Sequence, residues 1–146
     1  MKENQMIAIV RISGMVEIKT KVEETLYRLR LRRKYCCVVL NPTKEQAGMI
    51  KKIINFTAFG EIDDKTLKEL IEKRGLLIDK KKARPKTEDV IKGLKENKKF
   101  EDFNLKPFFR LHPPRKGIES KKHFGVNKGV LGNNKKEINK LIARML

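Results

Sequence analysis

Arginine is dense in one short stretch of the sequence, RLRLRRK, between residues 28 and 34. A guanidinium group presents a planar fork of N–H donors that matches two oxygens of a phosphate, so closely spaced arginines are typical of proteins that bind phosphate-bearing polymers. Cations are also favourable at the C-terminal end of a helix, but that effect explains only one or two of them. The stretch therefore predicts a phosphate-binding surface made of Arg28, Arg30, Arg32, Arg33 and Lys34.

A second basic stretch, FFRLHPPRKGIESKKHFG, covers residues 108–125. Its prolines stiffen the backbone, its glycines allow close approach to a ligand, and a chain this polar stays disordered unless a polyanion orders it. The alternative is a solvated linker. For its phenylalanines, packing on the protein body is favoured over stacking on bases. The predicted contacts are Arg110, His112, Arg115, Lys116, Lys121, Lys122 and His123, joined by Lys128 of the following GVNKGVLGNN.

The sequence offers no pattern for metal binding or nucleophilic catalysis. Cys36 and Cys37 are adjacent and His112 and His123 lie eleven positions apart, so the CxxC and HxxxH spacings of tetrahedral zinc sites are missing. Cys36 as a nucleophile would need an activating histidine, and both histidines lie in the loose basic stretch. We therefore predict no metal, no cofactor and no enzymatic activity.

The total charge points to a polyanionic partner. Thirty-six Lys and Arg against eighteen Asp and Glu give a formal charge of +18 over 146 residues, with a pI near 10.1. The excess is +6 in residues 1–62, +3 in residues 63–102 and +9 in residues 103–146, so the middle is a mixed, solvated region. The apolar run from Met6 to Val10 is too short for a signal peptide or a membrane-spanning helix. Adjacent cysteines in an apolar run favour a reducing compartment, so we expect a soluble, cytoplasmic protein.

The first sixty residues alternate short apolar runs with amphipathic stretches. Apolar residues three or four positions apart predict a helix from Thr20 to Lys34, capped by Thr20 with Glu23, and a second helix opened by a capping box of Thr43 and Gln46. This order predicts an α+β, ferredoxin-like fold in which a small three-stranded sheet carries both helices on one face. The β-branched, apolar runs that predict its strands are Met6–Ile12, Tyr35–Leu40 and Thr57–Glu61.

The rest of the chain predicts helices and an extension. One helix begins at Asp63-Asp64 and stops at Gly75, and another begins at Thr87. A final helix, with Asn134 and Glu137 as a capping pair, carries an apolar stripe that we expect to dock on the body. The predicted divisions are a core at 1–62, a helical insertion at 63–102, and a basic extended arm with the terminal helix at 103–146.

Six stretches, in order along nearly the whole chain, resemble the archaeal form of the universal large-subunit ribosomal protein L-thirty family, whose eukaryotic relative is called L-seven. One such match would be weak, but six in sequence are specific. They are VRISG, RLRLRRKY, NPT followed by EQAGMIKKI, TAFGEID with EKRG, FFRLHPPRKG and LGNNKKEINKLIARM.

The resemblance implies a non-catalytic component of the cytoplasmic ribosome that binds 23S-type ribosomal RNA and neighbouring ribosomal proteins, with no homo-oligomer and no membrane partner. It also implies a small strand-and-helix core, like that of the bacterial protein, followed by a C-terminal extension. In such proteins the first-helix arginines and the arm contact RNA. Residue by residue, this carries over to Arg11, Lys19, Lys21, Arg28, Arg30, Arg32, Arg33, Arg110, His112, Arg115 and Lys116.

Two other classes of function compete with this one. A free regulatory nucleic-acid-binding protein is compatible with the basic helix alone, but its long unsupported arm and the opening KVEE, which would repel phosphate, argue against it. An enzyme of nucleic-acid metabolism would need carboxylates clustered around metal ions. Helix capping and solvent-exposed ion pairing explain Asp63, Asp64 and Asp79.

Overall fold

A computed structural model describes residues 6–12, 14, 19–41, 43–96, 98–117, 120–123 and 129–146, with the side chains of 120–123 left aside. The predicted α+β class is confirmed, and so is the strand–helix–strand–helix–strand order of the first part of the chain. The elements of that part are β1 (Ile7–Arg11), α1 (Thr20–Arg28), β2 (Cys36–Leu40), α2 (Lys44–Lys52) and β3 (Thr57–Glu61). The later helices are α3 (Asp64–Arg74), α4 (Thr87–Lys95), the short 3₁₀ helix η1 (Phe100–Phe103), the 3₁₀ turn η2 (Lys135–Glu137) and α5 (Ile138–Met145).

The sheet is larger than the three strands predicted. Its strand order is β4-β2-β1-β3-β6-β5, with β1 antiparallel to both of its neighbours and β6 parallel to β3. The segment expected to be an irregular arm supplies β4, β5 and β6. Short, glycine-containing stretches have a weak propensity to form strands. They become strands here because the edges of the core sheet offer unpaired N–H and C=O groups to which they can hydrogen-bond. The added strands are β4 (Phe109–Arg110), β5 (Ser120–His123) and β6 (Gly129–Asn133).

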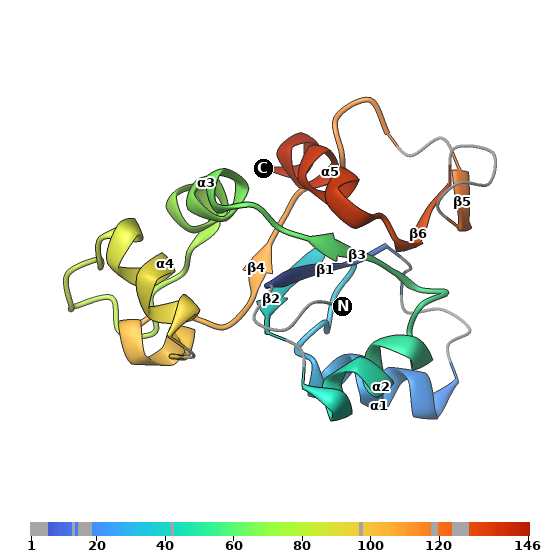
Figure 1. Ribbon diagram of the computed structural model, residues 1–146, viewed down its shortest axis with the longest axis horizontal. Coiled ribbons are helices and arrows are strands. Elements are labelled where there is room, and N and C mark those ends of the chain that lie inside the picture. The colour runs from blue at the N-terminus through green and yellow to red at the C-terminus, as the bar shows by residue number, and fades with distance from the viewer. Residues whose placement is uncertain are drawn as a thin grey trace.

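Both faces of the sheet are covered, which explains why its strands are continuously apolar. Successive side chains of a strand point to opposite faces. Ile7 and Ile9 of β1 pack with α1 and α2, whereas Ala8 and Val10 pack with α3, α4 and α5. Figure 1 shows α1 and α2 together on one side of the sheet, as predicted, and α3 and α5 on the other. The two cores are separated only by the sheet itself.

Three predicted helix signals are confirmed. Thr43 and Gln46 form both hydrogen bonds of a capping box at the start of α2. The carboxylate of Asp63 accepts a hydrogen bond from the Thr66 N–H at the start of α3, and that helix ends at Gly75. Each of these signals relies on residues no more than a few positions apart.

Two predicted caps are wrong. Lys19, not Thr20, occupies the N-cap of α1, and no side chain caps that end. The Asn134 side chain does not cap α5, because its amide donates to the carbonyls of Val130 and Gly132 and so closes the turn after β6. At α1 the helix begins one residue earlier than predicted, and at α5 main-chain carbonyls compete for the Asn134 side chain.

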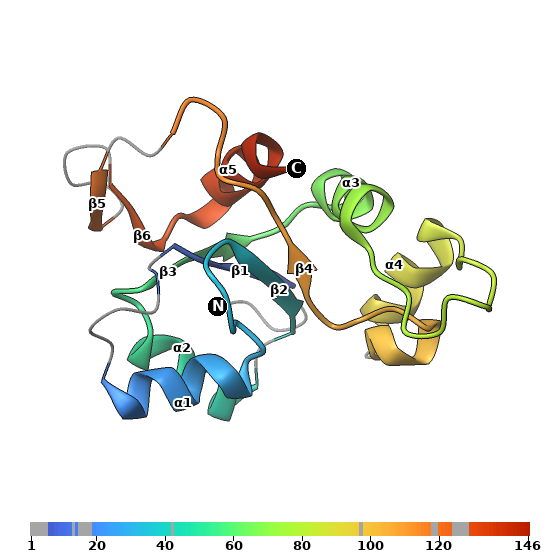
Figure 2. The same ribbon diagram turned by 180° about the vertical axis from the view of Figure 1, so that it is seen from behind.

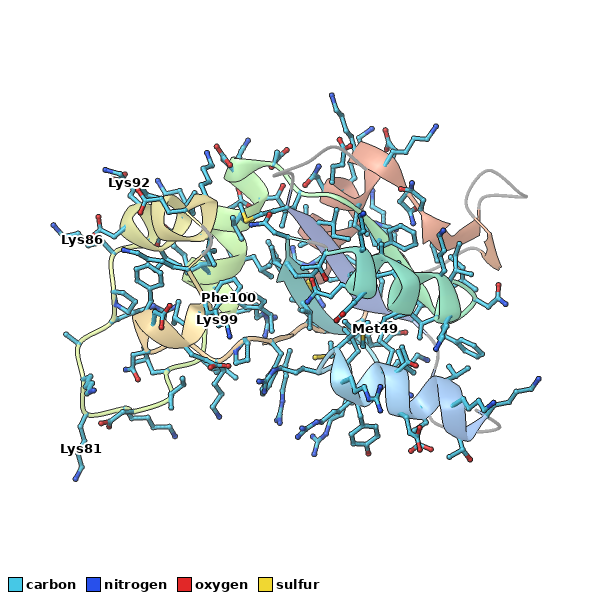
Figure 3. The ribbon with its side chains drawn as sticks, turned by 60° about the horizontal axis from the view of Figure 1, so that its bottom comes forward. Met49, Lys81, Lys86, Lys92, Lys99 and Phe100 are labelled. Atoms are coloured by element: carbon cyan, nitrogen blue, oxygen red, sulfur yellow. The ribbon has the colours of Figure 1, made fainter. Side chains whose placement is uncertain are left out.

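Helices α3, α4 and η1 build a second lobe beside the sheet. The Phe100 and Phe109 rings meet edge to face with centroids 5.5 Å apart, which joins η1 to β4. Gly93 of α4 lies directly against the Phe103 ring, where a Cβ would come within 2.1 Å of that ring. Figure 2 shows β4 at the sheet edge on the path towards this lobe, and in Figure 3 Lys81, Lys86 and Lys92 project outward at its far end.

Candidate nucleic-acid interface

The arginine-rich stretch, residues 28–34, begins at the last residue of helix α1 and continues as a turn, so only Arg28 belongs to that helix. We call it the arginine turn. α1 ends at Arg28, Leu29 is its C-cap, and Arg30 adopts a left-handed backbone with φ 64°. The predicted helix to Lys34 is therefore six residues too long. The Leu31 N–H bonds back to the Leu26 carbonyl, which closes the turn tightly.

Leucine and arginine alternate in this turn, and burial follows the alternation. Leu29 is 5% exposed and Leu31 is fully buried in the core that faces α1 and α2. The five cations predicted there are all exposed. Since the leucines are fixed in the core, the cations before, between and after them are held outward: Arg28, Arg30, Arg32, Arg33 and Lys34.

Arg11 does not lie on this surface, although the resemblance placed it among the contacts. It is 1% exposed, and its guanidinium donates to the carbonyls of Leu31 at 2.8 Å and Gly14 at 3.3 Å. Burial lowers the pKa of Arg11, while the charge of Glu23 acts in the opposite direction. Arg11 therefore supports the arginine turn from beneath, since it holds the carbonyl of a residue within that turn.

Strand β4 brings the arm to the arginine turn. β4 pairs with β2 so that Arg110 lies opposite Cys36, directly after the turn. A hollow of about 200 Å³ opens between them, and we call it the arginine hollow. The two surfaces that were predicted separately thus meet at one site. Its lining residues are Arg30, Arg32, Arg33, Cys36, Phe108 and Arg110.

Cys36 and Phe108 give the arginine hollow an apolar part. Cys36 is 4% exposed and its thiol donates to the Arg30 carbonyl at 3.6 Å. Burial raises the pKa of this thiol, and the nearby charges of Arg110 and Arg11 offset part of that rise. Phe108 packs partly into the core beside α1 and α2, and the Arg110 guanidinium lies 5.8 Å from its ring centroid. The hollow therefore combines four guanidinium groups with a neutral thiol and an aromatic ring.

Several cations of the turn are held by neighbouring groups. The Arg30 guanidinium contacts the Glu101 carboxylate at 3.3 Å, with both side chains about half exposed at 49% and 47%. Arg32 lies 5.6 Å from the centroid of the Tyr27 ring, and the Lys34 ammonium lies 5.1 Å from that of Tyr35. Such exposed contacts contribute little stability, but they reduce the number of side-chain conformations that a ligand must select.

The rest of the arm lies elsewhere. The ring nitrogens of His112 contact the main-chain oxygens of Pro113 and Leu146, so this side chain fastens the arm to the end of α5. Arg115 and Lys116 are exposed in the next turn. The Arg144 side chain of α5 donates to the Arg115 carbonyl, which places that turn on the α3 and α5 side of the sheet.

The remaining predicted contacts lie away from the arginine turn or among residues whose side chains the structure does not describe. Lys19 and Lys21 are exposed at the start of α1, about 13 Å along that nine-residue helix from the arginine turn. Lys121, Lys122 and His123 lie in β5, whose side chains are not described, and Lys128 lies outside the described residues.

Sequence reasoning missed the contribution of Phe108 and Cys36 to the arginine hollow. Phe108 stands two positions before Arg110 and so shares a side with it in an extended chain, which was the available signal. The sequence gives no such signal for Cys36, because nothing in an apolar strand pattern indicates which residue lines a surface hollow.

In the part of the chain that the structure describes, no cluster of three or more His, Cys, Asp or Glu side chains has the geometry to hold a metal ion. No helix there combines the length and apolar character needed to cross a bilayer.

Comparison with known proteins points to a single family. The family model described as ribosomal protein L30p/L7e matches residues 7–55. Large ribosomal subunit protein uL30 of Archaeoglobus fulgidus is 40% identical over 152 aligned positions, which cover 96% of this chain and 99% of that protein. The uL30 proteins of Methanococcus maripaludis strain C5 and Nanoarchaeum equitans are each 38% identical, over 95% of this chain and 98% and 97% of their own lengths. This chain therefore belongs to the L30p/L7e family of ribosomal proteins and is similar to archaeal uL30 members over nearly its whole length.

Proposed function

We propose that this chain is a structural, non-catalytic constituent of the large ribosomal subunit that binds 23S-type ribosomal RNA through the arginine turn and the arginine hollow. The observation that carries the proposal is the hollow itself. Arg30, Arg32 and Arg33 meet Arg110 there, although Arg110 lies far along the chain. Among the described residues, only one carboxylate, that of Glu101 beside Arg30, forms an ion pair with these four like charges, so a positive excess remains that a polyanion would neutralise.

The mechanism that we propose is phosphate neutralisation by a preshaped surface. Guanidinium forks contact phosphate oxygens of the RNA backbone, and release of the counterions they displace supplies affinity. Helical RNA hides its base edges in a deep, narrow major groove, so shape and backbone contacts determine placement. The buried leucines and Arg11 hold the turn in position before RNA arrives, which lowers the entropy lost on binding.

The names of the relatives support the cellular setting. They are large ribosomal subunit proteins, so we place this chain in the cytoplasm, on the ribosome, with ribosomal RNA and neighbouring ribosomal proteins as partners. We further propose that it enters the subunit as a single copy and does not form a homo-oligomer.

The decisive experiment is to purify large subunits from the source cells at low and high salt and to quantify this chain by mass spectrometry. We expect one copy per subunit at low salt and a partial loss of this chain at high salt, because phosphate contacts weaken as the salt concentration rises. A chain found mainly outside ribosomal particles would contradict the proposal and would instead support a free regulatory nucleic-acid-binding protein.

A further inference from the structure

A second basic surface lies in the region that the sequence had marked as mixed and solvated. The loop between α3 and α4, residues 79–86, has the sequence DKKKARPK, and we call it the lysine loop. It holds five cations and one acid, for a net charge of +4, whereas the remainder of residues 63–102 carries −1. The whole positive excess of this region is therefore concentrated in the lysine loop.

One end of the lysine loop is pinned by a single asparagine. The Asn104 side chain accepts from the Asp79 N–H at 2.9 Å and donates to the Asp79 carbonyl at 3.0 Å. The Asn104 carbonyl also accepts from the Ile78 N–H at 3.0 Å. Asn104 itself has a left-handed backbone with φ 61°, a conformation that asparagine tolerates better than most residues.

The other end is pinned by Arg84. Its guanidinium donates to the carbonyls of Ile71 at 2.6 Å and Glu72 at 3.0 Å in the last turn of α3, and the Ile71 carbonyl also accepts from the Gly75 N–H. Helix α4 begins at Thr87, directly after Lys86. The lysine loop is thus short and anchored on both sides, which distinguishes it from a freely moving basic tail.

Three lysines remain at the tip of the loop. Asp79 closes the tip, since its carboxylate accepts from the Lys81 N–H at 3.0 Å. Lys80, Lys81 and Lys82 are exposed, and none of the ion pairs found among described residues includes them. By contrast, Lys95 on nearby α4 contacts Asp64 at 2.8 Å. Figure 3 shows Lys81 directed away from the protein at its outer end.

The segment from Glu101 to Asn104 joins the lysine loop to the arginine hollow. Glu101 contacts Arg30, which lines the hollow, and three residues later Asn104 holds Asp79. The edge-to-face contact of Phe100 and Phe109 also joins η1 to β4, which supplies Arg110 to the hollow, so the folded structure sets the spacing between the two basic surfaces. A rigid spacing suits a polymer that has phosphates at regular intervals.

The apolar neighbours of the loop do not favour a protein partner. Leu76 and Ile78 are 38% and 51% exposed, but two side chains make a patch far smaller than a specific protein interface buries. Lysine is also depleted from the cores of protein interfaces, whereas it is a common partner of backbone phosphates.

We propose that Lys80, Lys81 and Lys82 form a second phosphate-binding site, which contacts the sugar–phosphate backbone of RNA at a point separate from the arginine hollow. This inference rests on the proposed RNA-binding function and deepens it. The lobe built by α3, α4 and η1 then presents an RNA contact of its own, at a position fixed by Asn104 and Arg84.

The test compares three variants of the full chain binding to 23S-type RNA of Archaeoglobus fulgidus transcribed in vitro. The first replaces Lys80, Lys81 and Lys82 with Ala, and the second replaces the same residues with Arg. The matched control removes three exposed lysines from the helices of the same lobe, by Lys65→Ala, Lys68→Ala and Lys92→Ala. Affinity is measured between about 0.05 and 0.2 M salt, where phosphate contacts dominate its salt dependence.

We expect the triple Ala variant to lower the slope of log affinity against log salt by about 2, at roughly 0.7 to 0.9 per lost contact, and to lower affinity on the order of 10- to 100-fold. The Arg variant should restore both, and the control should lose much less. Hydroxyl-radical footprinting should show one protected RNA segment lost in the Ala variant and the segment at the arginine hollow retained.

The outcomes separate this inference from the proposed function. If the triple Ala variant matches the control while Ala at Arg30, Arg32, Arg33 and Arg110 weakens binding, the lysine site is wrong and RNA binding stands. If the Ala variant binds RNA normally but fails to enter the subunit, the loop contacts a protein and the inference is overturned. If the unaltered chain does not bind RNA, the proposed function fails first. Unchanged thermal unfolding of the Ala variant would show that lost binding is not lost folding.

Discussion

The arginine turn and the basic arm are both rich in cations, but their cations are positioned in different ways. In the turn, Leu29 and Leu31 are buried between exposed arginines, so the charges project together from one place. In the arm, Arg110 joins the arginine hollow, His112 fastens the chain to α5, and Arg115 lies on the other side of the sheet. Charge density identifies a polyanion partner, whereas the spacing of buried anchors decides which charges act together.

The largest effect is expected from removing an anchor of the turn. Leu31→Ala deletes a fully buried side chain and should lower the free energy of unfolding by about 2 to 5 kcal/mol. The matched change in the arm, Leu111→Ala, removes a half-buried side chain and should have a smaller effect. Denaturant unfolding of both variants measures this difference. Equal losses would mean that the arm is anchored as firmly as the turn.

Removing the charges of the hollow should reduce binding without affecting the fold. Replacement of Arg30, Arg32, Arg33 and Arg110 by Ala should lower the salt slope of RNA affinity by about 3, if each guanidinium makes one phosphate contact. The double change Arg115→Ala and Lys116→Ala should lower it by about 1.8 at most. A larger effect of the double change would move the main contact surface to the α5 side of the sheet.

Arg11 should affect stability but not the charge of the binding surface. Arg11→Met keeps most of the apolar volume but leaves the Leu31 carbonyl without its donor, which should cost about 1 to 3 kcal/mol of stability. The salt slope of RNA binding by the folded variant should equal that of the unaltered chain. A slope reduced by nearly one unit would show that Arg11 reaches RNA after all.

The smallest effect concerns the two cysteines, which face opposite sides of the sheet. Burial raises the pKa of both thiols, so the folded protein keeps them protonated at a pH where the unfolded chain ionises. Stability from this source is complete below about pH 8.5 and falls as pH rises beyond it, by up to about 1.4 kcal/mol per pH unit for each thiol. Urea unfolding of Cys37→Ala against the unaltered chain, at rising pH, should show a shallower decline.

The reactivity of the two thiols shows whether RNA occupies the arginine hollow. Cys36 lines the arginine hollow and Cys37 is fully buried in the other core. A thiol reagent should modify Cys36 first, and bound RNA should slow that modification. Equal rates with and without RNA would contradict occupation of the hollow.

The local signals in the sequence were enough for much of the fold. The apolar runs around Ile9, Val38 and Phe59 predicted the three central strands, and the Thr43 capping box and the Asp63 cap marked two helix starts. These features depend on neighbouring residues, whose interactions are the same in any fold that contains the element. The concentration of arginine between residues 28 and 34 likewise identified the region of the candidate site.

Other features could not be obtained from local patterns because they depend on partners distant in the chain. β4 and β6 are strands because β2 and β3 offer them free edges, and Arg110 reaches the arginine turn only through that pairing. Arginine is usually exposed, yet Arg11 is buried and its guanidinium donates a hydrogen bond to the Leu31 carbonyl. The sequence by itself determined which residues form the central strands and where positive charge is dense. Only the tertiary structure decided which of those charges meet, because edge pairing and burial are set by contacts between distant segments.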